Sequence, residues 1–255
     1  MKELGESLQN SHKMSGEEET SPVLPAEANP DIELEPWERE VAGMHRAIQL
    51  VQQKADNSTD GGFNGDDILA IHRFVLNDPF NPHFSGKLRR VVVKIGSIVR
   101  GEYREANFVP VHPDDLPDLF GEFSNELESK TGEINTSSSV AQVVETSTWV
   151  HNELIRIHPF KDGNGRTARL LVDYIFKRAG LPYLTDWGAE SDEYKDVIDR
   201  TFKENNMNLF RKFIATKLLS RTVDVGSVDS SLSPDMERFG LETKAYIRSL
   251  KQDAA

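Results

Sequence analysis

The stretch HPFKDGNGRTAR, residues 158–169, places a histidine, an acidic side chain, a glycine-rich turn and two arginines within one short segment. His158 carries a side chain that titrates near neutral pH, so it is a candidate general base. Asp162 offers carboxylate oxygens of the kind that Mg²⁺ prefers, and Mg²⁺ is commonly shared between one or two carboxylates and substrate phosphates. The stretch therefore predicts metal-assisted chemistry on a phosphorylated substrate.

The glycine-rich turn predicts a phosphate cradle. Gly163 and Gly165 permit backbone conformations that other residues avoid, so consecutive N–H groups at a helix N-terminus can converge on an anion, and Asn164 adds a side-chain amide. Arg166 and Arg169 are three residues apart on the helix that should follow, hence on one face, and guanidinium groups bind phosphate oxygens bidentately. We expect these five residues to bind a nucleotide.

Each residue of the segment, taken alone, has an ordinary structural explanation. A histidine before a proline is more often a structural hydrogen-bonding group, and helix arginines are usually solvated. Phe160 is expected to anchor the loop in the core, although its place in the segment also makes it a candidate for the nucleotide site. Lys161 is expected to face solvent, with contact to the substrate as the alternative. The coincidence of all these residues at this spacing is what favours a nucleotide site.

The segment resembles the signature His-Pro-Phe-x-Asp/Glu-Gly-Asn-Gly-Arg-x-x-Arg of Fic (filamentation induced by cAMP) domains, and every fixed position is met. The resemblance implies a mainly α fold, a helical bundle with a β-hairpin flap over the active site. It also implies a protein adenylyltransferase, a nucleotidyltransferase that moves AMP from ATP to a Ser, Thr or Tyr hydroxyl of a target protein and needs Mg²⁺.

The same resemblance implies a role for each signature residue. His158 would deprotonate the target hydroxyl, and Asp162 would hold Mg²⁺ on the α- and β-phosphates. Asn164 and the glycine N–H groups would stabilise the α-phosphate, Arg166 would bind the β-phosphate and Arg169 the γ-phosphate.

The similarity extends upstream of the signature. The β-branched run at residues 90–98, with Gly96 and Gly101 near a turn, predicts two short strands whose free edge could pair with a target segment. The segments that resemble the family's flap and the helix start after it are GKLR at 86–89, residues 90–98, FVP at 108–110 and PDDLP at 113–117. An ordinary surface hairpin is the alternative.

Composition narrows the function further. The chain has 255 residues, no cysteine, no signal peptide and no long apolar run, so a cytoplasmic location without membrane spans is expected. Its formal net charge of −12 argues against binding to nucleic acid or to anionic membranes, because phosphate backbones are bound by clustered Lys and Arg. The expected partners are ATP and target proteins.

Hydrophobic patterning predicts three regions. Residues 1–35 are rich in Glu, Ser, Asn and Pro and are expected to form a disordered acidic arm. Residues 36–222 should form the catalytic domain, and residues 223–255 a linker and an amphipathic helix that begins at Ser233. Apolar spacing predicts helices from residue 37 and over 66–76, 114–128, 138–157, 163–178, 192–207 and 209–219.

Many Fic proteins carry an inhibitory Ser/Thr-x-x-x-Glu-Gly/Asn helix whose Glu pairs with the second signature arginine. The nearest match here runs from Ser233 to Glu237, but Arg238 stands where Gly or Asn belongs. We therefore expect a separate inhibitory partner, or a protein that is active as it stands.

Some alternatives remain open. The segment from Asp56 to Asp67 approximates an EF-hand calcium loop, although polar turns between helices arise readily without calcium. His151 and His158 lie on roughly one helical face, but the His-Glu-x-x-His pattern of zinc proteases is missing, so His151 is expected to be packed. The scaffold could instead transfer UMP, phosphocholine or phosphate, could remove AMP, or could serve as a catalytically silent binding module.

Overall fold

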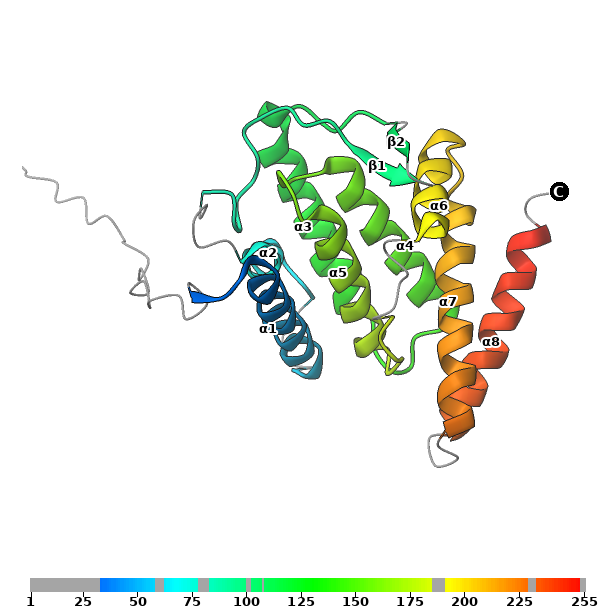
Figure 1. Cartoon of the computed structure of the whole chain (residues 1–255). Coiled ribbons are helices and arrows are strands. Elements are labelled where there is room, and N and C mark those ends of the chain that lie inside the picture. Colours follow the sequence, from blue (N-terminus) through cyan, green and yellow to red (C-terminus); the bar gives the residue numbers. More distant parts are fainter. Residues whose placement is uncertain are drawn as a thin grey trace, which may run out of the picture.

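Two antiparallel helices, α4 (Val140–Ile157) and α5 (Asn164–Arg178), form the centre of the molecule (Figure 1). The structure, a computed structural model, describes residues 33–57, 62–77, 83–99, 102–106, 108–184, 191–228 and 233–252. The predicted N-terminal arm lies outside the described residues, apart from its last three positions.

Both central helices carry many buried apolar side chains. Ser139 caps α4, since its hydroxyl accepts a hydrogen bond from the Gln142 N–H at 3.2 Å. The buried apolar residues of α5 follow one another almost without interruption, as expected of a helix that is covered on most sides. They are Leu170, Leu171, Val172, Tyr174, Ile175 and Phe176.

Helices α1 (Pro36–Asp56) and α2 (Gly65–Leu76) cover one side of α5 (Figure 1). Asn64 and Asp67 form a reciprocal capping box at the start of α2, and Lys54 binds the Asp67 carboxylate at 2.9 Å. The described end of the EF-hand-like segment thus serves as a helix cap. Its residues 58–61 lie outside the described part of the chain.

Helix α3 (Leu116–Gly132), preceded by the short 3₁₀ helix η2 (Pro113–Asp115), packs against α4. Helices α6 (Asp192–Lys203), α7 (Met207–Val228) and α8 (Ser233–Gln252) lie on the opposite side of the centre from α1 (Figure 1). Helix α7 runs nine residues past the predicted end at 219, because α8 packs along it and gives its last turns a partner. The other predicted helices agree within a few residues.

The strands β1 (Gly96–Val99) and β2 (Glu102–Glu105) pair antiparallel, with Gly96 opposite Glu105 and Val99 opposite Glu102. They are shorter than the predicted β-branched run, since residues 90–95 are not in a strand. Val91 and Val92 are 51% and 69% exposed, so these side chains find no apolar face that would favour an extended pair.

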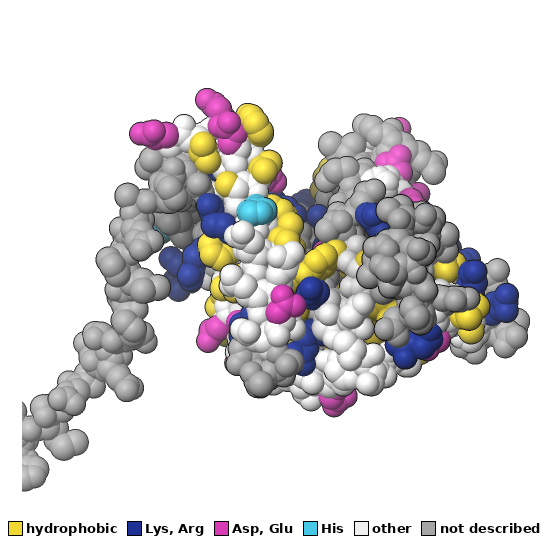
Figure 2. All heavy atoms as spheres, turned by 90° about the horizontal axis from the view of Figure 1, so that it is seen from below, with side chains coloured by type: hydrophobic (Ala, Val, Ile, Leu, Met, Phe, Trp, Pro, Cys, Tyr) yellow, Lys and Arg dark blue, Asp and Glu magenta, His cyan; other side chains and the backbone are white. Residues whose placement is uncertain are grey.

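The surface mixes charge types. On the face shown in Figure 2, the described basic and acidic side chains are interspersed with apolar ones. Among the described residues, no helix combines the length and the apolar character that a membrane crossing requires.

Gly43 of α1 tests the close contact between α1 and α2. A Cβ there would lie 2.2 Å from the Phe74 carbonyl oxygen, so Gly43→Ala should lower the free energy of unfolding by about 1–3 kcal/mol. Gly121 of α3 has no atom within 4 Å of such a Cβ, so Gly121→Ala should instead raise it by about 0.5–1 kcal/mol. Urea denaturation measures both changes, and equal effects of the two variants would contradict the packing.

Candidate active site

His158 ends helix α4 in a left-handed conformation, with φ 50° and ψ 59°. Its N–H still donates to the Leu154 carbonyl at 2.9 Å, and its Nδ1 lies 3.3 Å from the Ile155 carbonyl oxygen. A carbonyl can only accept, so Nδ1 carries the proton and Nε2 keeps a free lone pair. The terminus of α4 therefore presents an imidazole in the tautomer that a general base needs.

Burial lowers the pKa of His158 from 6.5 to about 4. The bond to the Ile155 carbonyl raises it, the charge of Arg89 lowers it and that of Asp162 raises it, and burial outweighs them all. The imidazole is thus neutral near pH 7 and ready to accept a proton.

Arg89, in the segment that precedes strand β1, binds the backbone around His158. It is 4% exposed, and its guanidinium donates to the carbonyls of His158 at 2.7 Å, Val111 at 2.6 Å and Val91 at 3.0 Å. Its own N–H donates to the Pro159 carbonyl at 2.8 Å. The sequence analysis missed this role, because a buried arginine whose guanidinium binds backbone carbonyls leaves no pattern in the sequence.

Phe160 lies in the core, as expected of an anchor. It does not line either of the two cavities, described below, whose walls include His158. Its ring is fully buried and stacks on the ring of His72, with centroids 3.7 Å apart and planes inclined by 7°. Asn164 closes the loop around it, since the amide accepts from the Phe160 N–H at 3.0 Å and donates to its carbonyl at 2.9 Å. The Asn164 side chain is therefore engaged in holding the loop.

His72 of α2 fixes the backbone of the acidic residue, which the sequence analysis also missed. Its Nδ1 accepts from the Gly86 N–H at 2.9 Å, so its proton is on Nε2, which donates to the Asp162 carbonyl at 2.9 Å. Burial lowers the pKa of His72 to about 4, so it stays neutral in this arrangement. The His72 ring thus joins three parts of the chain, which are helix α2, the segment at Gly86 and the signature loop at Asp162.

The N-terminus of α5 lies where the sequence predicts an anion cradle. Gly163 caps it with φ 78°, in the left-handed region that favours glycine, and the first helical bond runs from the Thr167 N–H to the Gly163 carbonyl at 2.9 Å. The N–H groups of residues 164–166 thus precede the helical ladder and are available to an anion. The Gly163 N–H donates to Asp162 Oδ1 at 2.6 Å.

A cavity of about 420 Å³ brings most of the predicted site residues together. It is lined by His158, Lys161, Asp162, Gly163, Asn164, Gly165, Arg166 and Arg169, and by Lys94, Ile95 and Gly96 at the start of the hairpin. The geometry thus joins a base, a carboxylate and two guanidinium groups at one helix N-terminus.

The two arginines have different partners. Arg166 contacts Asp162 and the α1 residue Glu40. Arg169 donates to the Tyr194 hydroxyl at 3.2 Å, and that hydroxyl lies 2.8 Å from Nε2 of His151. His151 is fully buried, as expected, and burial lowers its pKa to about 3, so it is neutral.

A second cavity of about 240 Å³ adjoins the first, since both are lined by His158, Gly165 and Arg169. Its walls are largely apolar. The residues that supply this character are Ile95, Ala106, Phe108, Ile155, Tyr194 and Ile198. A flat apolar group next to a phosphate chain would fit this pair of cavities.

The donor set suits a metal that arrives with its substrate. Among the described residues no three His, Cys, Asp or Glu side chains gather as a metal site. Asp162 supplies a single carboxylate, 74% exposed, at the edge of the phosphate cradle. One carboxylate plus substrate phosphates and water is a common environment for Mg²⁺, so the residues fit that ion.

Known proteins of one family resemble this chain. Residues 62–176 match the model of the Fic/DOC family. The chain is 31% identical to "Protein adenylyltransferase Fic" of Nematostella vectensis over 76% of this chain and 41% of that protein, and 32% identical to the protein of that name in Aedes aegypti over 73% and 33%. A solved structure of Fic-1, residues 134–508, from C. elegans superimposes with a TM-score of 0.61 at 25% identity, covering 82% of this chain and 55% of that one. The chain thus spans about two fifths or less of the length of these two curated relatives.

Arg89→Met tests the anchoring of the signature loop. The variant leaves buried carbonyls without a charged donor, so the free energy of unfolding should fall by about 2–4 kcal/mol. The exposed neighbour Arg90 provides the control, because Arg90→Met should change the free energy of unfolding by less than about 0.5 kcal/mol. Urea denaturation distinguishes the two, and a neutral Arg89→Met would refute the anchor.

Two buried histidines, His72 and His151, and the half-buried His158 predict a loss of stability in acid. His72, His151 and His158 have folded pKa values of about 4, 3 and 4, below the unfolded value of 6.5. Unfolding therefore takes up protons as pH falls from 6.5 towards 4, and stability should drop by about 4 kcal/mol per pH unit at the steepest. Denaturation at a series of pH values measures this slope. His158→Gln should reduce the slope by about one third, and a flat profile between pH 5 and 6.5 would contradict the burial of the three rings.

Proposed function

We propose that this chain, whose residues 62–176 belong to the Fic/DOC family, is a protein adenylyltransferase that transfers AMP from ATP to a Ser, Thr or Tyr hydroxyl of a target protein. The observation that carries the proposal is the convergence of the His158 base, the Asp162 carboxylate and the N-terminus of α5 on one cavity. Nucleotidyl transfer to a hydroxyl requires these three groups, which are a base, a metal-binding carboxylate and a phosphate-binding helix N-terminus.

The pair of adjoining cavities supports ATP as the donor. The adenine ring would occupy the apolar cavity, and the phosphates would extend over the N-terminus of α5. The α-phosphate would receive the N–H groups of residues 164–166, while Arg166 and Arg169 would bind the β- and γ-phosphates. Asn164 holds the loop that presents these groups.

Mg²⁺ would be held by Asp162 together with the α- and β-phosphates. When bound, it would neutralise charge on the phosphates and on the departing pyrophosphate. The signature loop fixes the carboxylate for this purpose, because His72 binds the Asp162 carbonyl and the Gly163 N–H binds Oδ1.

In the chemical step, Nε2 of His158 would take the proton of the target hydroxyl. The hydroxyl oxygen would form a bond to the α-phosphorus as the bond to the bridging oxygen of pyrophosphate breaks. The products are the adenylated side chain and pyrophosphate. Stabilisation of the phosphates by fixed N–H and guanidinium groups would add to this proton transfer.

The hairpin is the proposed docking element for the target and acts as the flap. Ile95 just before its first strand, Gly96 at the start of that strand and Ala106 after its second strand contribute to the cavity walls, beside His158. A target segment could add to a strand edge by backbone pairing, which would set its hydroxyl near the base.

The contacts of Arg169 bear on regulation. Its guanidinium donates to the Tyr194 hydroxyl and lies over the Tyr194 ring, 5.4 Å from the ring centroid. Because Arg238 interrupts the nearest match to the inhibitory pattern, we infer that a separate partner whose acidic group reaches Arg169 supplies any inhibition, or that the protein is active as it stands.

His158→Ala tests the proposal. Removing the base should lower transfer of label from α-labelled ATP to target proteins in a lysate by about 10²–10⁴-fold, while ATP binding should remain, because the phosphate ligands are intact. His45→Ala, an exposed residue of α1, serves as the control and should transfer normally. Mass spectrometry of the modified protein identifies AMP against other groups. Labelling by His158→Ala at the wild-type level would overturn the assignment.

A further inference from the structure

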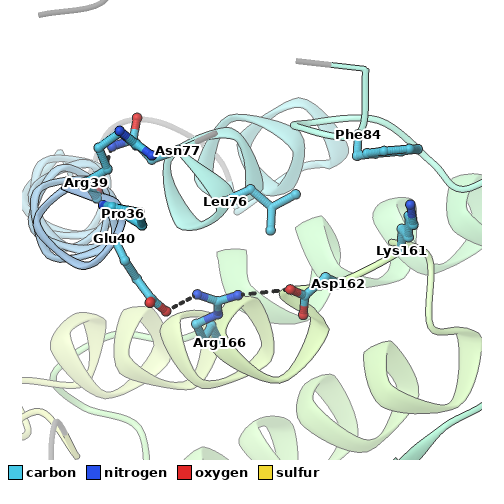
Figure 3. Close-up of a pocket in the computed structure, with 9 residues that line it drawn as sticks. All are labelled: Pro36, Arg39, Glu40, Leu76, Asn77, Phe84, Lys161, Asp162 and Arg166. Carbon is cyan, nitrogen blue, oxygen red and sulfur yellow. Dashed lines mark hydrogen bonds and ion pairs between the residues drawn. The ribbon is translucent and has the colours of Figure 1, made fainter. Parts of the chain in front are cut away.

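Arg166 lies between two carboxylates that come from different parts of the fold (Figure 3). Its Nη1 donates to Oε1 of Glu40 on α1, and its Nη2 lies 3.4 Å from Oδ2 of Asp162 in the signature loop. All three residues line a cavity of about 640 Å³ on the α1 side of the loop. The Glu40 contact is outside the signature and would not be suspected from it.

The two contacts of Arg166 are unequal. The contact with Glu40 is the closer one, whereas 3.4 Å is long for a charge-assisted hydrogen bond. A guanidinium fork can bind one carboxylate through two parallel N–H groups, and the four-residue spacing of Asp162 and Arg166 would allow this pairing. In this structure Nη1 of Arg166 binds Glu40, so Arg166 contacts Asp162 through Nη2 only and does not form the two-bond pair.

The Asp162 oxygen that remains for a cation is Oδ2. The other oxygen, Oδ1, already accepts the Gly163 N–H at 2.6 Å. A divalent cation at this carboxylate thus depends on Oδ2, and an arginine held closely against it would compete directly for its lone pairs.

The second cation of the loop is also kept away from Asp162. The Lys161 ammonium lies 3.7 Å from the centroid of the Phe84 ring, and in Figure 3 its side chain points towards Phe84 while Asp162 points towards Arg166. Such a contact attracts a cation electrostatically. Glu40 and Phe84 therefore each draw one neighbouring cation from the carboxylate.

We propose that Glu40 is a positioning residue that restricts the pairing of Arg166 with Asp162 to one long contact and so keeps the Asp162 carboxylate available to a divalent cation. The inference rests on the proposed function, in which that cation accompanies the nucleotide. It also gives α1, which lies outside the segment matched to the family, a direct effect on the metal-binding group.

Glu40 is well suited to substitution. It is 59% exposed and sits on a helix that is tied to α5 at its other end by the Asp56–Lys177 ion pair, at 3.3 Å. Glu40→Gln removes the charge and keeps the shape, and Glu40→Asp keeps the charge on a shorter side chain. Asp56→Asn breaks the other ion pair between α1 and α5 and provides a matched control remote from the loop.

The test compares binding with and without metal. Mn²⁺ affinity in the presence of ADP is measured by electron paramagnetic resonance, and ADP affinity in EDTA by calorimetry, for the wild type and the three variants. Glu40→Gln should weaken Mn²⁺ binding by about tenfold, the lower end of what loss of an outer-shell partner costs. ADP binding in EDTA should not weaken, since a negative charge near the phosphates has been removed. Glu40→Asp should lie between Glu40→Gln and the wild type, and Asp56→Asn should match the wild type.

Three results would overturn the role of Glu40. They are equal Mn²⁺ affinity in the wild type and Glu40→Gln, an equal loss of ADP binding with and without metal, and a loss in Asp56→Asn as large as in Glu40→Gln. Both readouts measure binding, so a wild type that binds Mn²⁺ and ADP but transfers no AMP would overturn the proposed function alone.

Discussion

The site depends on the closure of one short turn between two buried helices. Helices α4 and α5 pack side by side, and residues 158–163 must reverse the chain between them while leaving polar groups at the surface. The turn is closed from inside by the paired hydrogen bonds of Asn164 to Phe160 and by the stacking of Phe160 on His72. Because the apolar ring faces the core, the charged members of the segment are left at the cavity.

Buried polar side chains then join this turn to the elements around it. Arg89 binds the carbonyls of His158 and Val111, and His72 bridges Gly86 and Asp162. Buried donors and acceptors are costly when they lack partners, so each of these groups specifies one arrangement of the turn. The histidine base and the carboxylate thus reach the cavity on a rigid backbone, which is what preorganised stabilisation of charge requires.

Much of this was predictable from local sequence. The helices follow from apolar spacing, and the signature names the base, the carboxylate, the glycines and the arginines because their chemistry is carried by residue type. The contacts of Arg89, His72 and Glu40 with the signature segment were not predictable, since they join residues 69–126 positions apart and no periodicity encodes them. The strand lengths at the hairpin were overestimated because β-branched residues favour strands only where a packed face receives them.

The electrostatics of the loop explain how an acidic chain can bind an anion. Each cation of the signature is held by a different weak partner: Lys161 by an aromatic ring, Arg166 by exposed carboxylates and Arg169 by a tyrosine hydroxyl. Exposed ion pairs and cation–ring contacts contribute only about 1 kcal/mol or less each, so they leave the cations able to attract a phosphate. The same contacts restrict the side chains beforehand, so binding of the proposed nucleotide would cost less conformational entropy. Weak restraint thus serves the site better than strong pairing, which would neutralise the cations, or none, which would leave them disordered.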